Sequence, residues 1–153
     1  MFEYRPEHIM SYVATLGKRE QLGPVPEGLR VNVHVTGGEV TGPKVFGTFS
    51  TMGGDWFTVR RDGVVILDVR ATIETRDGAL IYMTYNGTSD LGKSGYEQIV
   101  TGALPVQGRP IRMSPRFQTS HPNYIWLNRI HCFGVGHSFP EKSEVAYDVY
   151  AIR

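Results

Sequence analysis

Hydrophobic and polar residues alternate along most of the chain, and this period of two predicts β-strands rather than helices. The longest alternating stretch covers residues 61–87 and is divided at residues 75–78, which read Thr-Arg-Asp-Gly. An Asp-Gly pair between two alternating segments indicates a two-residue hairpin turn. We therefore predict that residues 61–87 form two long antiparallel strands at the centre of the fold.

Shorter alternating segments occupy much of the remaining chain, and glycines and prolines separate them. The chain contains 18 glycines and nine prolines, an abundance typical of short strands joined by tight turns. The further expected strands cover residues 7–16, 29–36, 39–41, 45–50, 55–59, 111–119, 124–135 and 144–152. Residues 96–108 are compatible with either a helical turn or a short strand.

About nine or ten short strands with hardly a helix predict an all-β protein, either a closed barrel or a sandwich. Successive long hairpins favour a single antiparallel up-and-down β-barrel over a Greek key. A length of 153 residues suffices for one domain with a substantial core and is short for two. We predict one barrel domain over residues 1–153.

Composition argues against several classes of function. Hydrophobic residues make up 41% and charged residues 20% of the chain, as in ordinary globular proteins. A net charge of +1 without a basic run argues against nucleic-acid binding. No apolar segment is long enough to span a bilayer, and the first residues do not resemble a signal peptide. These features predict a cytoplasmic protein that binds neither nucleic acid nor membranes.

The central strand carries charged residues on one face and apolar residues on the other. Asp68, Arg70 and Glu74 oppose a continuous apolar face within residues 65–73. An apolar face normally packs in the core, which would leave the charges on an outer wall, where ion pairs contribute about 0–1 kcal/mol. Charges facing the interior would need partners and would have shifted pKa values suited to acid–base chemistry. The sequence leaves both arrangements open.

Asp55 is a second candidate for acid–base chemistry. It follows a Gly-Gly pair and precedes Trp56, so its carboxylate could bind or deprotonate a small ligand at a barrel rim. The equally weighted alternative is an Asp bonded to its own turn, with Trp56 in the core.

Further candidates would bind a ligand rather than transfer a proton. Tyr124, Trp126 and Asn128 share one face of the strand predicted over residues 124–135, and form either a platform for an aromatic ligand or part of the core. The remaining candidates are Tyr82 and Asn86 from the second strand of the central hairpin, and Arg116, a partner for a ligand anion or a structural ion pair.

Histidine and cysteine spacing gives no metal or nucleophile signature. His121, His131 and His137 match no zinc-binding spacing. Cys132 is the one cysteine, which excludes an intramolecular disulfide, and we expect a buried, inert thiol. Nucleotide-binding and serine-hydrolase motifs are absent from the sequence. We expect no metal and no cofactor.

A set of short motifs, each weak alone, together resembles one known family. The motifs are Pro26-Glu27-Gly28, Thr36-Gly37-Gly38, Gly42-Pro43, Gly54-Asp55-Trp56, Asp62-Gly63, Asp68-x-Arg70, Asp77-Gly78-Ala79, Trp126-Leu127-Asn128 and Gly134-x-Gly136. They resemble the small bacterial and fungal β-barrel proteins catalogued as a domain of unknown function, from about Gly23 onward. The resemblance implies a lipocalin-like or allene-oxide-cyclase-like barrel, often a homodimer, and brings no established reaction. Gln118 departs from the acidic residue common at this position, which puts any carboxylate role there in doubt.

The residues and the resemblance lead to one functional hypothesis and two alternatives. We expect a cofactor-independent isomerase, cyclase or lyase that holds a small aromatic or cyclic metabolite in the barrel. Asp55, Arg70 and Glu74 form the expected catalytic set, with Asp55 as the acid–base. Arg116 and Arg70 would stabilise anions, and the other ligand-binding candidates would position the metabolite. The alternatives are a non-catalytic carrier or sensor, and a dimeric interaction module.

Overall fold

The computed structural model describes residues 1–103 and 107–153. Within these ranges the chain forms nine strands, one short α-helix and two 3₁₀ helices. The strands are β1 (Pro6–Val25), β2 (Gly28–Thr41), β3 (Gly47–Phe49), β4 (Gly54–Val59), β5 (Val64–Thr75), β6 (Leu80–Asp90), β7 (Pro110–Gln118), β8 (His131–Phe139) and β9 (Glu144–Ile152). The helices are α1 (Gly95–Val100), η1 (Ile125–Arg129) and η2 (Pro140–Lys142).

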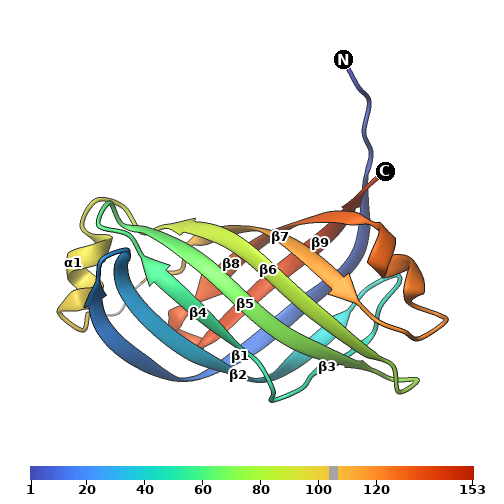
Figure 1. The fold of residues 1–153 in the computed structure, drawn as a ribbon, viewed down its shortest axis with the longest axis horizontal. Coiled ribbons are helices and arrows are strands. Elements are labelled where there is room, and N and C mark those ends of the chain that lie inside the picture. Colours follow the sequence, from blue (N-terminus) through green and yellow to red (C-terminus); the bar gives the residue numbers. More distant parts are fainter. Residues whose placement is uncertain (104–106) are drawn as a thin grey trace.

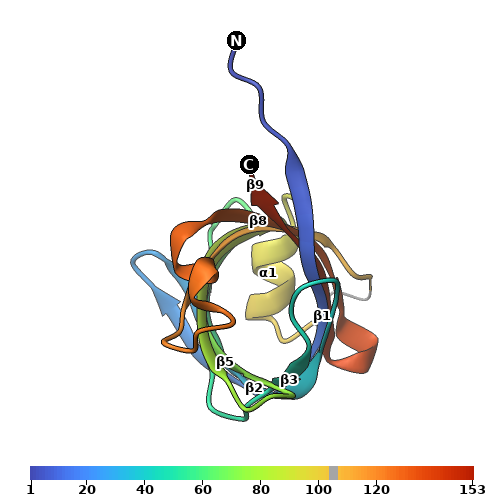
Figure 2. The same ribbon diagram turned by 90° about the vertical axis from the view of Figure 1, so that its right-hand side faces the viewer.

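The strands form a closed antiparallel barrel (Figures 1 and 2). Strands that follow one another in the chain pair with each other, except β3 and β4, and β9 pairs with β1 to close the ring. Strands β3 and β4 both lie between β2 and β5 and share one strand position. The ring therefore has eight positions, a size whose interior either fills with side chains or holds one small ligand. The predicted all-β up-and-down barrel is confirmed.

The central hairpin forms as predicted, with a different turn. The N–H of Thr75 donates to the carbonyl of Ala79 at 2.9 Å, which leaves three residues in the loop rather than the expected two. Gly78 has a φ of +81°, a left-handed conformation that glycine adopts without strain and that a three-residue hairpin loop requires. The correction concerns the turn alone, because β5 and β6 pair along their whole length.

The apolar face of β5 lines the interior of the barrel. Val65, Leu67, Val69, Ala71 and Ile73 are all buried, and the residues between them are half-buried or exposed. Burial of a large aliphatic side chain contributes about 1.5–3 kcal/mol, so this alternation decides which face turns inward. The charged face of β5 is therefore an outer wall.

Helix α1 closes one end of the barrel, as the end-on view shows (Figure 2). Tyr96 and Ile99 are buried and belong to the hydrophobic core. Residues 96–108 were compatible with a helical turn or a short strand, and their first part forms the helical turn of α1. Residues 104–106 lie outside the described residues. No helix of the described chain is long and apolar enough to cross a membrane.

The strand predicted over residues 124–135 is wrong in its first half. Residues Ile125–Arg129 form η1, and β8 begins at His131. The side chain of Asn128 accepts the N–H of Thr119 at 2.9 Å and donates to its carbonyl at 2.8 Å. These two bonds satisfy the backbone N–H and carbonyl of Thr119, directly after β7, which would otherwise need a partner on a neighbouring strand. Alternation of residue types does not reveal a bond between residues nine positions apart.

Candidate active site inside the barrel

Asp55 carries a carboxyl group into the barrel. On β4 it lies opposite Val33 of β2 on one side and Val69 of β5 on the other. Both valines are 4% exposed, and directly opposite residues in a sheet point to the same face. The carboxyl group of Asp55 therefore faces the interior, where an ionisable side chain is rare.

The environment of Asp55 favours its neutral form. One carboxyl oxygen, Oδ1, accepts the backbone N–H of Asp68 at 3.0 Å. Desolvation by burial raises the pKa of Asp55 from 3.8 to about 7, with a smaller upward contribution from the charge of Asp68. The hydrogen bond and the positive charge of Arg30 oppose this shift without cancelling it. A carboxyl group with a pKa near neutrality can both release and take up a proton.

A cavity of about 110 Å³ borders Asp55 on the side of α1. Most of its lining is apolar, and its charged or hydroxyl-bearing side chains come from several elements of the barrel. The lining residues are Leu16, Arg19, Val33, Asp55, Phe57, Val65, Leu67, Ser89, Leu91, Ile99, Ile111, Ser138, Pro140, Ser143, Glu144 and Val145. An acid in a largely apolar cavity is the combination expected of a proton-transfer site.

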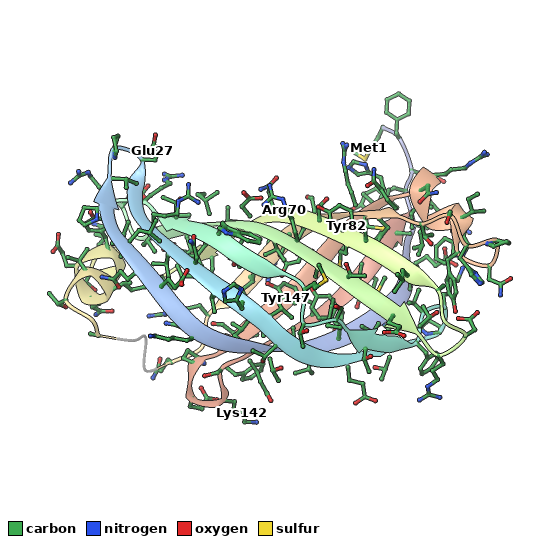
Figure 3. All side chains as sticks on the ribbon, turned by 60° about the horizontal axis from the view of Figure 1, so that its bottom comes forward. Met1, Glu27, Arg70, Tyr82, Lys142 and Tyr147 are labelled. Carbon is green, nitrogen blue, oxygen red and sulfur yellow. The ribbon has the colours of Figure 1, made fainter. Side chains whose placement is uncertain are left out.

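Three tyrosines fill the neighbouring part of the interior. Tyr12, Tyr85 and Tyr147 are at most 7% exposed, and the Tyr147 ring lies 5.0 Å from Tyr12 and 5.8 Å from Tyr85 between centroids. Figure 3 shows Tyr147 within the barrel. Burial raises the pKa of all three phenols well above 10, and the charges of the neighbouring phenols and of Asp55 add to this, while hydrogen bonds from Tyr85 and Tyr147 lower the pKa values of Tyr12 and Tyr85 without cancelling the shift. The phenols therefore stay protonated and able to donate hydrogen bonds.

No hydrogen bond of ordinary geometry joins the buried hydroxyl of Tyr12 to another described residue, although the Tyr85 phenol lies near enough to lower the pKa of Tyr12 by hydrogen bonding. Room for the neighbouring ring comes from Gly136, where a Cβ atom would lie 2.3 Å from the Tyr147 ring. None of these tyrosines stands out in the sequence, because their strands have the pattern of ordinary core segments.

Arg19 is a further interior charge that the alternation of residues does not predict. On β1 it lies opposite Val33, the same residue that faces Asp55 from β4. The pairing of β1 with β2 shifts between Leu16 and Arg19, and the extra residue reverses which side chains point inward. Without this bulge the alternation that buries Tyr12 and Ala14 would place Arg19 outside. In the sequence, the bulge is indicated only by Gly17 and Gly37, which lie beside it.

Arg70 and Glu74 lie away from Asp55, on the outer face of β5. The guanidinium of Arg70 lies 3.2 Å from the carboxylate of Asp68 and 5.4 Å from the Trp56 ring centroid. Figure 3 shows Arg70 on the outer side of the barrel. Both side chains are therefore separated from the carboxyl group of Asp55 by the barrel wall, and the catalytic role expected of them stays a prediction.

Three of the expected ligand-binding residues meet in one groove outside the barrel. Tyr82, Arg116 and Asn128 line this groove, which has a volume of about 970 Å³ and lies between the outer face of β6–β7 and η1. Asn86 lies on the same outer face and donates to the carbonyl of Leu67 at 3.1 Å. These residues were expected to lie together inside the barrel. They do lie together, but outside the interior cavity that was expected to hold the metabolite.

Tyr124 and Trp126 hold the segment around η1 in place. The Tyr124 hydroxyl donates to Asp77 at 3.0 Å, which ties η1 to the tip of the central hairpin. The Trp126 indole donates to the carbonyl of Asn123 at 3.1 Å, and its ring lies 5.6 Å from the ammonium of Lys44. Both side chains thus have structural partners, and because η1 replaces a strand they do not form the expected flat platform.

Possible metal ligands and the thiol of Cys132 lie among the described residues. No group of three or more His, Cys, Asp or Glu side chains is placed to hold a metal ion within residues 1–103 and 107–153. The Cys132 thiol is buried, and burial raises its pKa to about 11. A thiol that stays protonated at neutral pH is a poor nucleophile.

Comparison with known proteins gives a family without an assigned reaction. The family model described as "Protein of unknown function (DUF3237)" matches residues 5–152. A curated relative from Rhodopseudomonas palustris (strain TIE-1), named "UPF0311 protein", is 30% identical over 148 residues, which are 95% of each chain.

Solved structures give the same architecture. A β-barrel-like protein from Acinetobacter baumannii AYE has a TM-score of 0.84 at 27% identity, covering 100% of this chain and 98% of its own. A structure described as an enzyme from Penicillium herquei has a TM-score of 0.74 at 24% identity, covering 100% and 97%. The last likeness shows the fold alone, and the homodimer expected from the sequence stays a prediction. The chain belongs to the DUF3237 family of proteins of unknown function.

Proposed function

We propose that the protein is a cofactor-independent enzyme in which Asp55 transfers a proton within a small aromatic or cyclic metabolite bound in the barrel cavity. The observation that carries this proposal is the interior carboxyl group of Asp55, which has a pKa of about 7 and borders a cavity. Proton transfer by a carboxyl group needs no further reagent, and a pKa near the working pH gives the most effective acid–base.

The chemical step is a proton shuttle. The Asp55 carboxylate takes a proton from a C–H or O–H group of the metabolite and becomes a carboxylic acid. The electron pair left behind forms a new double bond or attacks within the molecule, and Asp55 returns the proton to a different atom. Return to another carbon or oxygen gives an isomerisation or a ring closure, and return to a leaving group gives an elimination.

Two features of the interior support this role. The Asp68 N–H bond holds one carboxyl oxygen in position, and the largely apolar lining disfavours the charged form of the carboxyl group. The cavity of about 110 Å³ is smaller than a cavity of about 150 Å³ known to hold benzene, so it would take only the reacting part of such a metabolite.

The test is proton exchange into enolisable and phenolic compounds. The protein is incubated in D₂O with a panel of such compounds, and deuterium incorporation is followed by NMR. For a compound that the wild type labels, we expect Asp55→Asn to lose at least about 100-fold in rate, while Asp62→Asn in an exposed turn keeps the full rate. Retention of the rate by a folded Asp55→Asn protein would refute the proposal. Binding without exchange across the panel would instead indicate the carrier function.

A further inference from the structure

Two side chains of opposite charge face the barrel cavity from strands that do not pair with each other. Arg19 on β1 and Asp55 on β4 lie on either side of Val33, and both line the cavity. Neighbouring strands are about 4.8 Å apart, so the two backbone positions are separated by roughly 10 Å along the barrel wall.

Arg19 has no acidic partner within ion-pair distance in the described part of the chain. Desolvation by burial lowers the pKa of its guanidinium, with no opposing contribution from a nearby carboxylate. Arginine nevertheless stays charged in proteins. A partly buried guanidinium without a partner is suited to binding an anion, and its planar fork matches a carboxylate in particular.

We propose that Arg19 binds the carboxylate of the substrate, so that the substrate is a small organic acid whose reacting atom lies beside Asp55. This inference rests on the proposed function, since Asp55 defines which part of the cavity holds the reacting atom. Small organic acids would be the substrate class, and Arg19 the residue that positions them. The bulge in β1 gives the site its second charge, because it turns Arg19 toward the cavity.

The affinity of the cavity for a carboxylate should depend on pH, because the charge of the cavity does. When Asp55 is protonated, Arg19 gives this part of the cavity a positive charge, and when Asp55 is ionised the two charges oppose each other. The other groups that act on Asp55 are Arg30 and Asp68, and Glu144 is the second acidic side chain that lines the cavity. The three buried phenols stay neutral. A carboxylate is therefore expected to bind more tightly at about pH 6 than at about pH 8.

The experiment measures binding of two matched pairs of probes, acetate with acetamide and benzoate with benzamide, by NMR titration of the labelled protein. Each acid should bind at least about ten-fold more tightly than its amide at about pH 6. Arg19→Gln should abolish this preference and Arg19→Lys should keep part of it. Lys18→Gln removes the same charge from the adjacent exposed position and should change nothing. Circular dichroism confirms that each variant is folded.

The outcomes separate this inference from the proposed function. Absence of binding by either acid, or a preference for acids that survives in Arg19→Gln, would overturn the anion site. Asp55→Asn should keep the preference and lose its pH dependence, together with the exchange activity. If Asp55→Asn keeps the exchange activity while Arg19→Gln loses the preference for acids, the anion site stands and the proposed proton transfer is wrong.

Discussion

Replacement of Asp55 by Asn should stabilise the protein at neutral pH, by an amount that depends on pH. The amide keeps an oxygen that can accept the Asp68 N–H bond, so the variant removes the charge with little change of shape. A pKa of about 7 in the folded state, against 3.8 as the ordinary value, corresponds to at most about 4 kcal/mol, because each pKa unit is worth about 1.4 kcal/mol. Solvent that reaches the carboxyl group through the cavity reduces this figure.

The sign of the effect follows from proton binding. Between about pH 4 and pH 7 the folded protein holds a proton on Asp55 that the unfolded chain has released, so the free energy of unfolding falls as the pH rises. Below about pH 4 both states are protonated at this position and the contribution is fully present, whereas above pH 7 it is lost. The advantage of Asp55→Asn over the wild type should therefore grow between about pH 4 and 7 and then level off.

Urea denaturation at a series of pH values measures this difference. Asp62→Asn is the matched control, because a hydrogen bond from Arg60 lowers the pKa of Asp62. Its ionised form is favoured by folding, so this variant should lose stability relative to the wild type as the pH rises. A constant difference between wild type and Asp55→Asn from pH 4 to 8 would show that the Asp55 pKa is not raised, and the basis of the acid–base assignment would be lost.

Three further predictions concern the scaffold and the thiol. Gly63 has a φ of +88°, and a Cβ atom there would lie 1.9 Å from the carbonyl oxygen of Gly92; Gly63→Ala should therefore lower the free energy of unfolding by at least about 1–3 kcal/mol in urea, and an unchanged midpoint would contradict this reasoning. Leu127 is 1% exposed, and Leu127→Ala should cost about 2–5 kcal/mol by the same measurement, whereas Leu80→Ala on the exposed face should cost less than about 1 kcal/mol. Cys132 should react with a thiol reagent at about pH 8 at least ten-fold more slowly in the folded protein than in urea, because its pKa is raised to about 11; equal rates would show that the thiol is accessible and ionised.

The placement of the strands was predictable because burial in a sheet imposes a period of two. The alternation in residues 61–87 predicted β5 and β6, and the apolar face of β5 does turn inward, as the alternation favoured. The turn between them differs by one loop residue, since the bond between Thr75 and Ala79 depends on the paired strands as well as on the Asp-Gly sequence. The prediction over residues 124–135 failed because alternation also occurs in Ile125–Arg129, which form η1, and there the side chain of Asn128 bonds to the backbone of Thr119.

The sequence by itself determined an antiparallel barrel and pointed to Asp55, because residue type and spacing carry the burial pattern and the presence of an isolated acid. Tertiary structure alone decided what surrounds that acid. Arg19 faces the cavity because of a bulge in the pairing of β1 with β2, and Tyr12, Tyr85 and Tyr147 converge from three strands. Arg70 and Glu74 lie outside because β5 buries its other face. A site formed across a closed sheet depends on register and closure, and these arise only when distant strands pair.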